Sequence, residues 1–255
     1  MKTDAVLTEA VLIETVLTPE SVQTVLAVGA HPDDLEILCA GTLAKYAKAG
    51  VKVVMAIATD GSAGHMVIPA SELKEIRHLE AKNSAAIIGA ELHWLGYTDE
   101  LIFEDISTRL RFVDLIRQAK PDVILTHAPN DYHPDHRVVS RLVFDASFLS
   151  SLPHIQTEYA AHPGVQSLYY FDVLSGLNFV PSEFVDISET FAIKKQMLES
   201  HVSQLKWLKD HDGINALDFI EIMSRSRGLQ CGVVLAEGFR PEQGWGRMRP
   251  YRVLP

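Results

Sequence analysis

The strongest constraint on the fold is the alternation of short apolar runs with longer amphipathic segments over the first 150 residues. The first run, residues 23–30, is rich in valine and alanine, which is typical of a strand buried on both faces of a parallel sheet. Apolar residues at helical spacing follow from Leu35 to Ala47, and Gly50 suits the end of that helix. The pattern therefore predicts a strand followed by a helix.

The same pair of elements recurs three more times. The predicted strands and the helices that follow them are residues 51–58 and 71–88, 91–95 and 106–119, and 122–126 and 138–150. Pro121 ends the third helix, because proline cannot continue a helix and disfavours it at the preceding residue. This alternation predicts an α/β fold, a single Rossmann-like three-layer domain with a mostly parallel sheet and helices on both faces.

The pattern is weaker beyond Pro153. There we expect strands at residues 166–173, 178–179 and 231–237, and helices at residues 187–207 and 214–227. A chain of 255 residues is long enough for one large domain over residues 1–255. We expect an N-terminal extension at 1–22, a strand-helix core carrying the site at 23–150, and a part completing the substrate pocket at 151–255.

The charge of the chain limits its partners. Asp and Glu total 33 against 23 Lys and Arg, a net charge of -10, which would repel nucleic acid and anionic membrane surfaces. The N-terminus lacks a basic segment followed by an apolar one, and no apolar run approaches the ~20 residues that span a bilayer. Cys39 and Cys231 each lie in an apolar stretch and are expected to be buried free thiols. We therefore expect a soluble cytoplasmic protein that acts on a neutral or cationic small molecule.

Two unusual loops occupy related positions in this pattern. The sequence HPDD, residues 31–34, follows the first predicted strand, and HPDH, residues 133–136, comes after the fourth. In open α/β sheets ligands bind beyond the carboxyl ends of the strands where the strand order reverses, commonly between strands one and four. The two loops are therefore expected to form one site, although about 100 residues separate them in the sequence.

Helix capping is the simpler interpretation of either loop alone. Proline presets the backbone for the first turn of a helix, and a carboxylate suits the positive end of the helix dipole. The occurrence of both sequences in one chain makes capping a weak explanation for the pair.

The residue types in the two loops fit metal-assisted hydrolysis. His31, Asp34 and His136 offer two imidazoles and one carboxylate, the ligand count of a catalytic zinc site that keeps one position for water. Water at such a site yields hydroxide near neutral pH. Asp33 is then free to act as the base that takes the proton of the water.

A second histidine of the HPDH loop is a candidate for the remaining catalytic role. His133, with Asp135 close enough in sequence to orient its ring, can stabilise the oxyanion and protonate the leaving amine. Together these residues predict the hydrolysis of an amide.

At these residues the chain resembles the LmbE-like (PIG-L) deacetylases. The resemblance rests on both loops and on the surrounding segments, residues 28–44, 58–64, 76–91, 125–137 and 236–240. Members of this family remove N-acetyl groups from N-acetylglucosaminyl compounds with a bound metal, usually zinc. The resemblance therefore implies one Zn²⁺ or other divalent ion per chain, a small-molecule N-acetylated sugar as substrate, and a homo-oligomer.

The resemblance also implies roles for individual residues. His31, Asp34 and His136 would be the metal ligands and Asp33 the general base. His133, backed by Asp135, would be the acid and oxyanion stabiliser.

Two further positions match residues that hold the substrate in relatives. These are Arg77, three residues before Glu80, and Asp99. From the residues alone, Arg77 could equally be a solvated helix charge and Asp99 an ordinary turn residue. Some relatives have a tyrosine two residues before the acid histidine, where this chain has Asp131, with Tyr132 next to it.

Two alternatives stay open at this stage. The same site could cleave another amide, such as that of a thiol conjugate or a modified antibiotic. The fold could also present a metal or sugar-binding module without turnover, although binding alone needs neither Asp33 nor His133.

Overall fold

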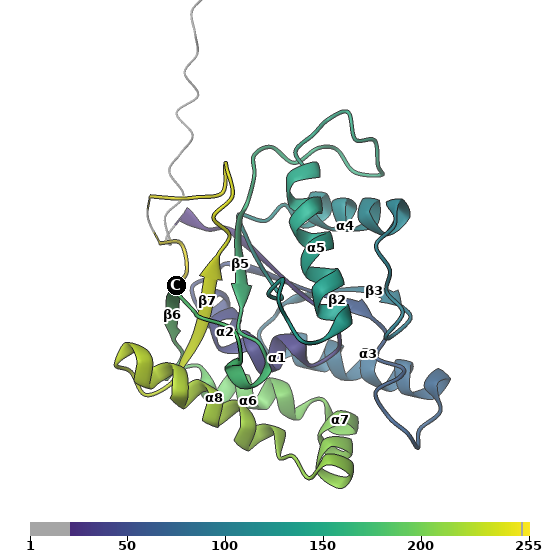
Figure 1. Cartoon of the computed structure of the whole chain (residues 1–255), viewed down its shortest axis with the longest axis vertical. Coiled ribbons are helices and arrows are strands. Elements are labelled where there is room, and N and C mark those ends of the chain that lie inside the picture. Colours follow the sequence, from purple (N-terminus) through teal and green to yellow (C-terminus); the bar gives the residue numbers. More distant parts are fainter. Residues whose placement is uncertain (1–20, 251) are drawn as a thin grey trace, which may run out of the picture.

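The computed structural model of the chain describes residues 21–250 and 252–255, so most of the predicted extension at 1–22 lies outside the described residues. One sheet of seven strands in the order β3-β2-β1-β4-β5-β7-β6 forms the centre of the molecule, and helices cover both of its faces (Figure 1). The predicted α/β fold is confirmed. No helix among the described residues is long and apolar enough to cross a membrane.

The first five strands in spatial order are parallel. The strands are β1 Thr24–Gly29, β2 Lys52–Thr59, β3 Glu91–Tyr97, β4 Val123–Thr126, β5 Ser167–Phe171, β6 Glu183–Asp186 and β7 Ala236–Pro241. Strand β7 runs antiparallel to both β5 and β6, so the sheet is mostly parallel with a mixed edge.

α-Helices follow β1, β2, β3 and β4 as predicted. The α-helices are α1 Asp34–Leu38, α2 Ala40–Lys48, α3 Ala70–Ile87, α4 Ile106–Ala119, α5 Pro134–Leu149, α6 Phe191–Glu199, α7 Val202–Trp207 and α8 Ala216–Cys231. There are also a short 3-10 helix, η2 Leu174–Gly176, and a short π-helix, η3 Leu208–Asp212.

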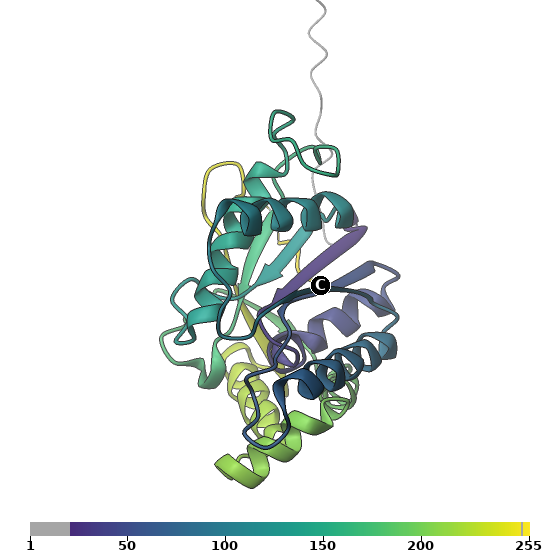
Figure 2. The ribbon, with the colours of Figure 1, turned by 90° about the vertical axis from the view of Figure 1, so that its right-hand side faces the viewer.

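Alternate residues of the buried strands face two separate cores. Val25 and Ala27 of β1 pack with side chains of α1, α2 and α6, whereas Leu26 and Val28 pack with side chains of α4 and α5. All four side chains are buried, which explains why β1 reads as a continuous apolar run. Figure 2 shows the sheet between these two helical layers.

A buried ion pair ties the antiparallel edge to the first helices. The carboxylate of Glu237 in β7 accepts hydrogen bonds from the backbone N–H groups of Gly41 and Thr42, at 2.9 and 2.8 Å, at the start of α2. Lys194 of α6 donates to the same carboxylate at 2.6 Å. Residues 236–240, which carry part of the family resemblance, therefore hold three elements together at this point.

Several predicted boundaries are wrong. The first predicted helix is interrupted at Cys39, where φ is -145° and ψ is 6°, so that it forms α1 and α2. The helix predicted at 187–207 forms α6 and α7, with a break before His201. Residues 178–179 are not a strand, and the edge strand is β6 instead.

The last predicted strand, 231–237, overlaps the end of α8. This helix continues to Cys231 and ends at Gly232, whose left-handed φ of 82° suits glycine, and β7 begins only at Ala236. Cys231 is consequently exposed rather than buried, whereas Cys39 is buried as predicted.

Candidate active site

Two loops meet at the carboxyl ends of β1 and β4, which are neighbours near the centre of the sheet. The loop after β1 carries the HPDD sequence into α1, and the loop after β4 carries residues 127–133 into α5. The backbone N–H of Ala30 donates to Nε2 of His127 at 3.0 Å and so joins the two loops. The structure thus brings the two predicted halves of the site together.

The three predicted metal ligands His31, Asp34 and His136, called the triangle below, bring four donor atoms close together. Nδ1 of His31 lies 3.2 Å from Nε2 of His136, whereas Oδ2 of Asp34 lies 3.4 Å from the first nitrogen and Oδ1 of Asp34 lies 3.3 Å from the second. A tetrahedral ion with bonds of about 2.0–2.2 Å holds its ligand atoms roughly 3.3–3.6 Å apart. His31, Asp34 and His136 therefore fit a single metal ion, although their role as ligands stays a prediction.

Carboxylates lie behind both imidazoles of this triangle. Oδ2 of Asp131 lies 3.1 Å from Nδ1 of His136. Oδ1 of Asp99 and Oδ2 of Asp135 lie 3.3 and 3.5 Å from Nε2 of His31. Metal-ligating histidines usually donate their second N–H to a carboxylate or carbonyl, which fixes the nitrogen that faces the ion. The arrangement leaves Nδ1 of His31 and Nε2 of His136 to face Asp34.

The charge balance at the triangle also favours a cation. Burial opposes protonation of both imidazoles, but the surrounding carboxylates outweigh it and raise the pKa of His31 to about 10 and that of His136 to about 9. Burial would raise the pKa of Asp34, yet His136 and His127 hold it well below its ordinary value. Positive charge is therefore stabilised at this point, whether a proton or a metal ion supplies it.

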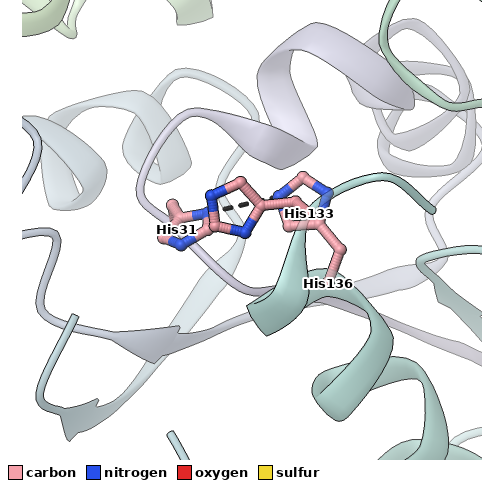
Figure 3. Close-up of side chains that lie close together, drawn as sticks. All are labelled: His31, His133 and His136. Carbon is pink, nitrogen blue, oxygen red and sulfur yellow. Dashed lines mark hydrogen bonds between the residues drawn. The ribbon is translucent and has the colours of Figure 1, made fainter. Parts of the chain in front are cut away.

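His133 lies beside the triangle, at the start of α5 (Figure 3). Its ring centroid is 4.6 Å from those of both His31 and His136. Its Nδ1 accepts a hydrogen bond from the backbone N–H of Asp135 at 3.3 Å, and its Nε2 lies 3.2 Å from the Glu100 carboxylate. Burial and the neighbouring His31 and His136 lower the pKa of His133.

The Asp135 carboxylate lies within 4.8 Å of a His133 ring nitrogen, but its closest contacts are with other residues, and its pairing with His133 stays a prediction. That carboxylate faces His31 and accepts a hydrogen bond from the backbone N–H of Glu100 at 3.0 Å. The backbone of Asp135, not its side chain, contacts the His133 ring. Residues two apart in the first turn of a helix point in different directions, which accounts for the difference.

Asp33 begins α1 in a strained conformation. Its φ of 111° lies in the left-handed region that non-glycine residues rarely adopt, and such strain concentrates at functional sites. Burial raises the pKa of Asp33 to about 6, although Arg77 opposes this shift. The carboxylate of Asp33 contacts Arg77, whereas that of the adjacent Asp34 contacts His31 and His136.

Arg77 lies beneath Asp33 and is only 3% exposed, so it is not a solvated helix charge. Its guanidinium donates to Asp33 at 3.2 Å, to the carbonyl of Pro32 and to the carbonyl of Gly61 at 3.1 Å. A Cβ at Gly61 would lie 2.7 Å from Nη1 of Arg77, so the loop after β2 closes on the guanidinium. Arg77 therefore fixes the positions of two loops of the site.

Asp99 is also buried against protein groups. Its carboxylate accepts hydrogen bonds from Thr59 Oγ1 at 3.2 Å and from the backbone N–H of Ala63 at 2.9 Å, and it faces His31. Asp99 thus joins the end of β2, the loop that follows it and His31.

Three residues near the metal triangle were not assigned a role from the sequence: His127, Asp131 and Glu100. His127 is fully buried, stacks on the His136 ring at a centroid distance of 3.9 Å and lies 3.1 Å from Asp34. Burial and His136 lower the pKa of His127 to about 4, so it is a neutral packing partner of the site. Its position directly after a buried strand was the only signal in the sequence.

Comparisons with known proteins place the chain in a family. Residues 26–147 match the family model described as GlcNAc-PI de-N-acetylase, PIG-L. The chain is 30% identical over 201 residues to a diacetylchitobiose deacetylase of Thermococcus kodakarensis, an alignment that covers 72% of this chain and 70% of that protein.

Solved structures share the fold. An N,N'-diacetylchitobiose deacetylase from Pyrococcus horikoshii superposes with a TM-score of 0.79 at 24% identity and covers 98% of each chain. The 4-carboxy-2-hydroxymuconate hydratase GalB from Pseudomonas putida KT2440 superposes with a TM-score of 0.77 at 21% identity, over 87% of this chain and 97% of that one. Because a hydratase shares the fold, the reaction must be argued from the residues of the site.

Proposed function

This chain belongs to the LmbE-like (PIG-L) family of deacetylases, and on that premise we propose that it hydrolyses the N-acetyl group of an N-acetylglucosamine-type sugar or sugar conjugate. The observation that carries the proposal is the triangle of His31, Asp34 and His136 with the buried Asp33 next to it. The triangle fits one divalent cation, and a separate buried carboxylate provides a base. Together they fit the hydrolysis of an amide.

We infer that zinc is the ion. Two imidazoles and one carboxylate form a donor set typical of catalytic zinc, and other divalent metals can share it. When bound there, the ion would polarise the amide carbonyl and make a water molecule acidic enough to attack it near neutral pH.

Asp33 is the proposed proton acceptor. Arg77 holds one oxygen of its carboxylate, and residue 33 has a strained, left-handed backbone at the start of α1. Asp33 takes a proton from the attacking water as the new C–O bond forms. The same proton is then available to the amine nitrogen when the C–N bond breaks, so the products are acetate and a free amino sugar.

His133 is the proposed oxyanion donor. Because its Nδ1 accepts from the backbone of Asp135, the proton of the neutral ring lies on Nε2. That N–H can donate to the carbonyl oxygen as negative charge develops on it. The second role predicted for His133, protonation of the leaving amine, stays a prediction.

We infer that Arg77 and Asp99 position the site rather than hold the substrate. Both are buried, and the hydrogen bonds of both are made to neighbouring loops. Arg77 acts through Asp33, and Asp99 acts through His31. Substitution of Arg77 or Asp99 tests whether that residue contacts the sugar, because loss of such a contact would raise KM.

A panel of acetylated compounds tests the proposed reaction. Acetate release is measured with N-acetylglucosamine, its methyl glycoside, N,N'-diacetylchitobiose and an N-acetylcysteine thiol conjugate, each with and without chelator. We expect chelator-sensitive release from the sugars. Release from the thiol conjugate alone would favour the alternative amidase, and no release from any compound would favour the non-catalytic binding module. Cytoplasmic location and a homo-oligomeric state stay predictions.

A further inference from the structure

A cavity of about 480 Å³ lies beside the catalytic residues. Its wall is built by α1, the loop before α5, the segment around η2, and the stretch from η3 into α8. The side chains that matter most for its character are Ile37, Tyr132, Leu174, Leu177, Ile214 and Phe219. This size is typical of a pocket for a small organic ligand.

The cavity lies next to the site. Tyr132 lines it, and the Tyr132 ring centroid lies 5.8 Å from that of His133 and 6.1 Å from that of His136. Ile37 also lines it and follows Asp34 by three residues on α1, so both lie on the same side of that helix. A group attached to the reacting amide or its sugar can therefore reach the cavity.

The lining of the cavity is mostly apolar, with Asn130, Ser175 and Asn178 as its polar members, in contrast to the carboxylate-rich site. Among the described residues that line it, none is charged. Leu177 is 71% exposed and Ile214 is 43% exposed, although large aliphatic side chains are usually buried. A second large cavity, on the β6 edge, is lined instead by charged residues such as Lys45, Glu183 and Arg252. Of these two cavities, the one beside the site is the one that suits a hydrocarbon group.

The apolar wall is held in place by a buried ion pair. Arg227 of α8 donates to both carboxylate oxygens of Asp172, at 2.6 and 2.9 Å, directly before the η2 segment. Gly176 of η2 has a left-handed φ of 68°, and a Cβ there would lie 2.7 Å from the same guanidinium. The segment that carries Leu174 and Leu177 is therefore formed before a ligand arrives, which reduces the ordering that binding requires.

We propose that the natural substrate is an N-acylated sugar that carries an alkyl or aryl group, and that this group occupies the cavity. The inference rests on the proposed deacetylase function and names the class of its substrate. The hydrocarbon could be a substituent on the anomeric oxygen of the sugar or an extension of the N-acyl group. The chemistry of binding is the same in both cases, which is transfer of an apolar group from water into an apolar cavity.

Two substrate series test the proposal and distinguish the two sources. One series keeps the N-acetyl group and lengthens an alkyl glycoside from methyl to octyl. The other keeps the methyl glycoside and lengthens the N-acyl chain from acetyl to hexanoyl. We expect kcat/KM to rise by up to about fourfold for each added methylene in one series. A flat response in both series contradicts this proposal while leaving the deacetylase function intact.

Binding of the product amines provides a measurement that does not depend on turnover. Alkyl glycosides of glucosamine are titrated into the protein by calorimetry, and the length of the alkyl chain is varied. If the glycoside carries the hydrocarbon, Kd falls with chain length. If Kd and both kcat/KM series are independent of chain length, the proposal is wrong. Absence of turnover for every compound contradicts the proposed function and this inference with it.

One exposed leucine in the cavity wall and one exposed isoleucine outside it provide a matched pair of variants. Leu177→Asp introduces a charge into the cavity wall, whereas Ile222→Asp introduces one on α8 at a side chain that is 67% exposed and does not line the cavity. We expect Leu177→Asp to remove most of the dependence on chain length and Ile222→Asp to keep it. The same loss in both variants would show that the dependence does not arise from this cavity.

Discussion

Oδ2 of Asp131 lies 3.1 Å from Nδ1 of His136, on the side of the ring opposite the nitrogen that faces Asp34. Asp131 also accepts a hydrogen bond from the backbone N–H of His133 at 3.0 Å. One carboxylate therefore orients a proposed metal ligand and begins the turn that carries the proposed oxyanion donor.

Asp131→Asn should weaken metal binding by about 10- to 100-fold, the usual effect of losing a carboxylate behind a ligating histidine. The affinity is measured by competition with a chromophoric chelator. Asp145→Asn, at a partly exposed partner of Arg109, is the control and should bind the metal as the unaltered protein does. Unchanged affinity in Asp131→Asn would show that Asp131 does not support the ion.

Arg77→Lys should lower kcat by roughly 10- to 100-fold with little change in KM. Lysine keeps the charge but offers one nitrogen in place of the two that reach Gly61 and the Pro32–Asp33 pair, so the base would move from its position. Steady-state kinetics on the methyl glycoside of N-acetylglucosamine measures both constants. A rise in KM at unchanged kcat would instead support direct contact between Arg77 and the substrate.

Asp33→Asn should lower kcat by about 10²- to 10⁴-fold while metal content stays at the level of the unaltered protein. The amide has nearly the same shape as the carboxylate but cannot accept the proton. Elemental analysis and acetate release are measured on the same sample. Full activity with metal bound would exclude Asp33 as the base, and loss of metal would assign it to the ligand set.

Lys194→Met should lower the free energy of unfolding by about 3–5 kcal/mol, because Glu237 would keep a buried charge without its partner. Urea denaturation of metal-free protein measures the change. Lys195→Met, at the next and less buried position of α6, should change it by no more than about 0.5 kcal/mol. Equal stability of both variants would show that the ion pair with Glu237 contributes little.

The parallel half of the fold was visible in the sequence because its strands are buried on both faces. Their apolar runs, together with Pro121 between α4 and β4, leave few alternative assignments of helices and strands. The antiparallel edge was harder, since β6 has only four residues and its pattern does not differ from that of a loop. The break between α6 and α7 was not predictable either. It lies at His201, whose buried ring pairs with Glu36 at 3.2 Å, a contact that only the tertiary structure reveals.

The sequence predicted those residues of the site that lie in the two short motifs. HPDD and HPDH identified the residues that meet at β1 and β4. The supporting contacts were not predictable, because Asp131, His127 and Glu100 reach their partners through loop conformation rather than through spacing. Proximity in sequence also did not reveal the contact of Asp135 with His31, which its carboxylate faces from the first turn of α5.

The central claim is that one metal ion at His31, Asp34 and His136 makes this chain a deacetylase. The most direct measurement is acetate release from the methyl glycoside of N-acetylglucosamine as zinc is added to chelator-treated protein. We predict no release without metal and a rise that reaches its maximum at one zinc per chain. Equal release at every zinc level, or no release at any level, would contradict the claim.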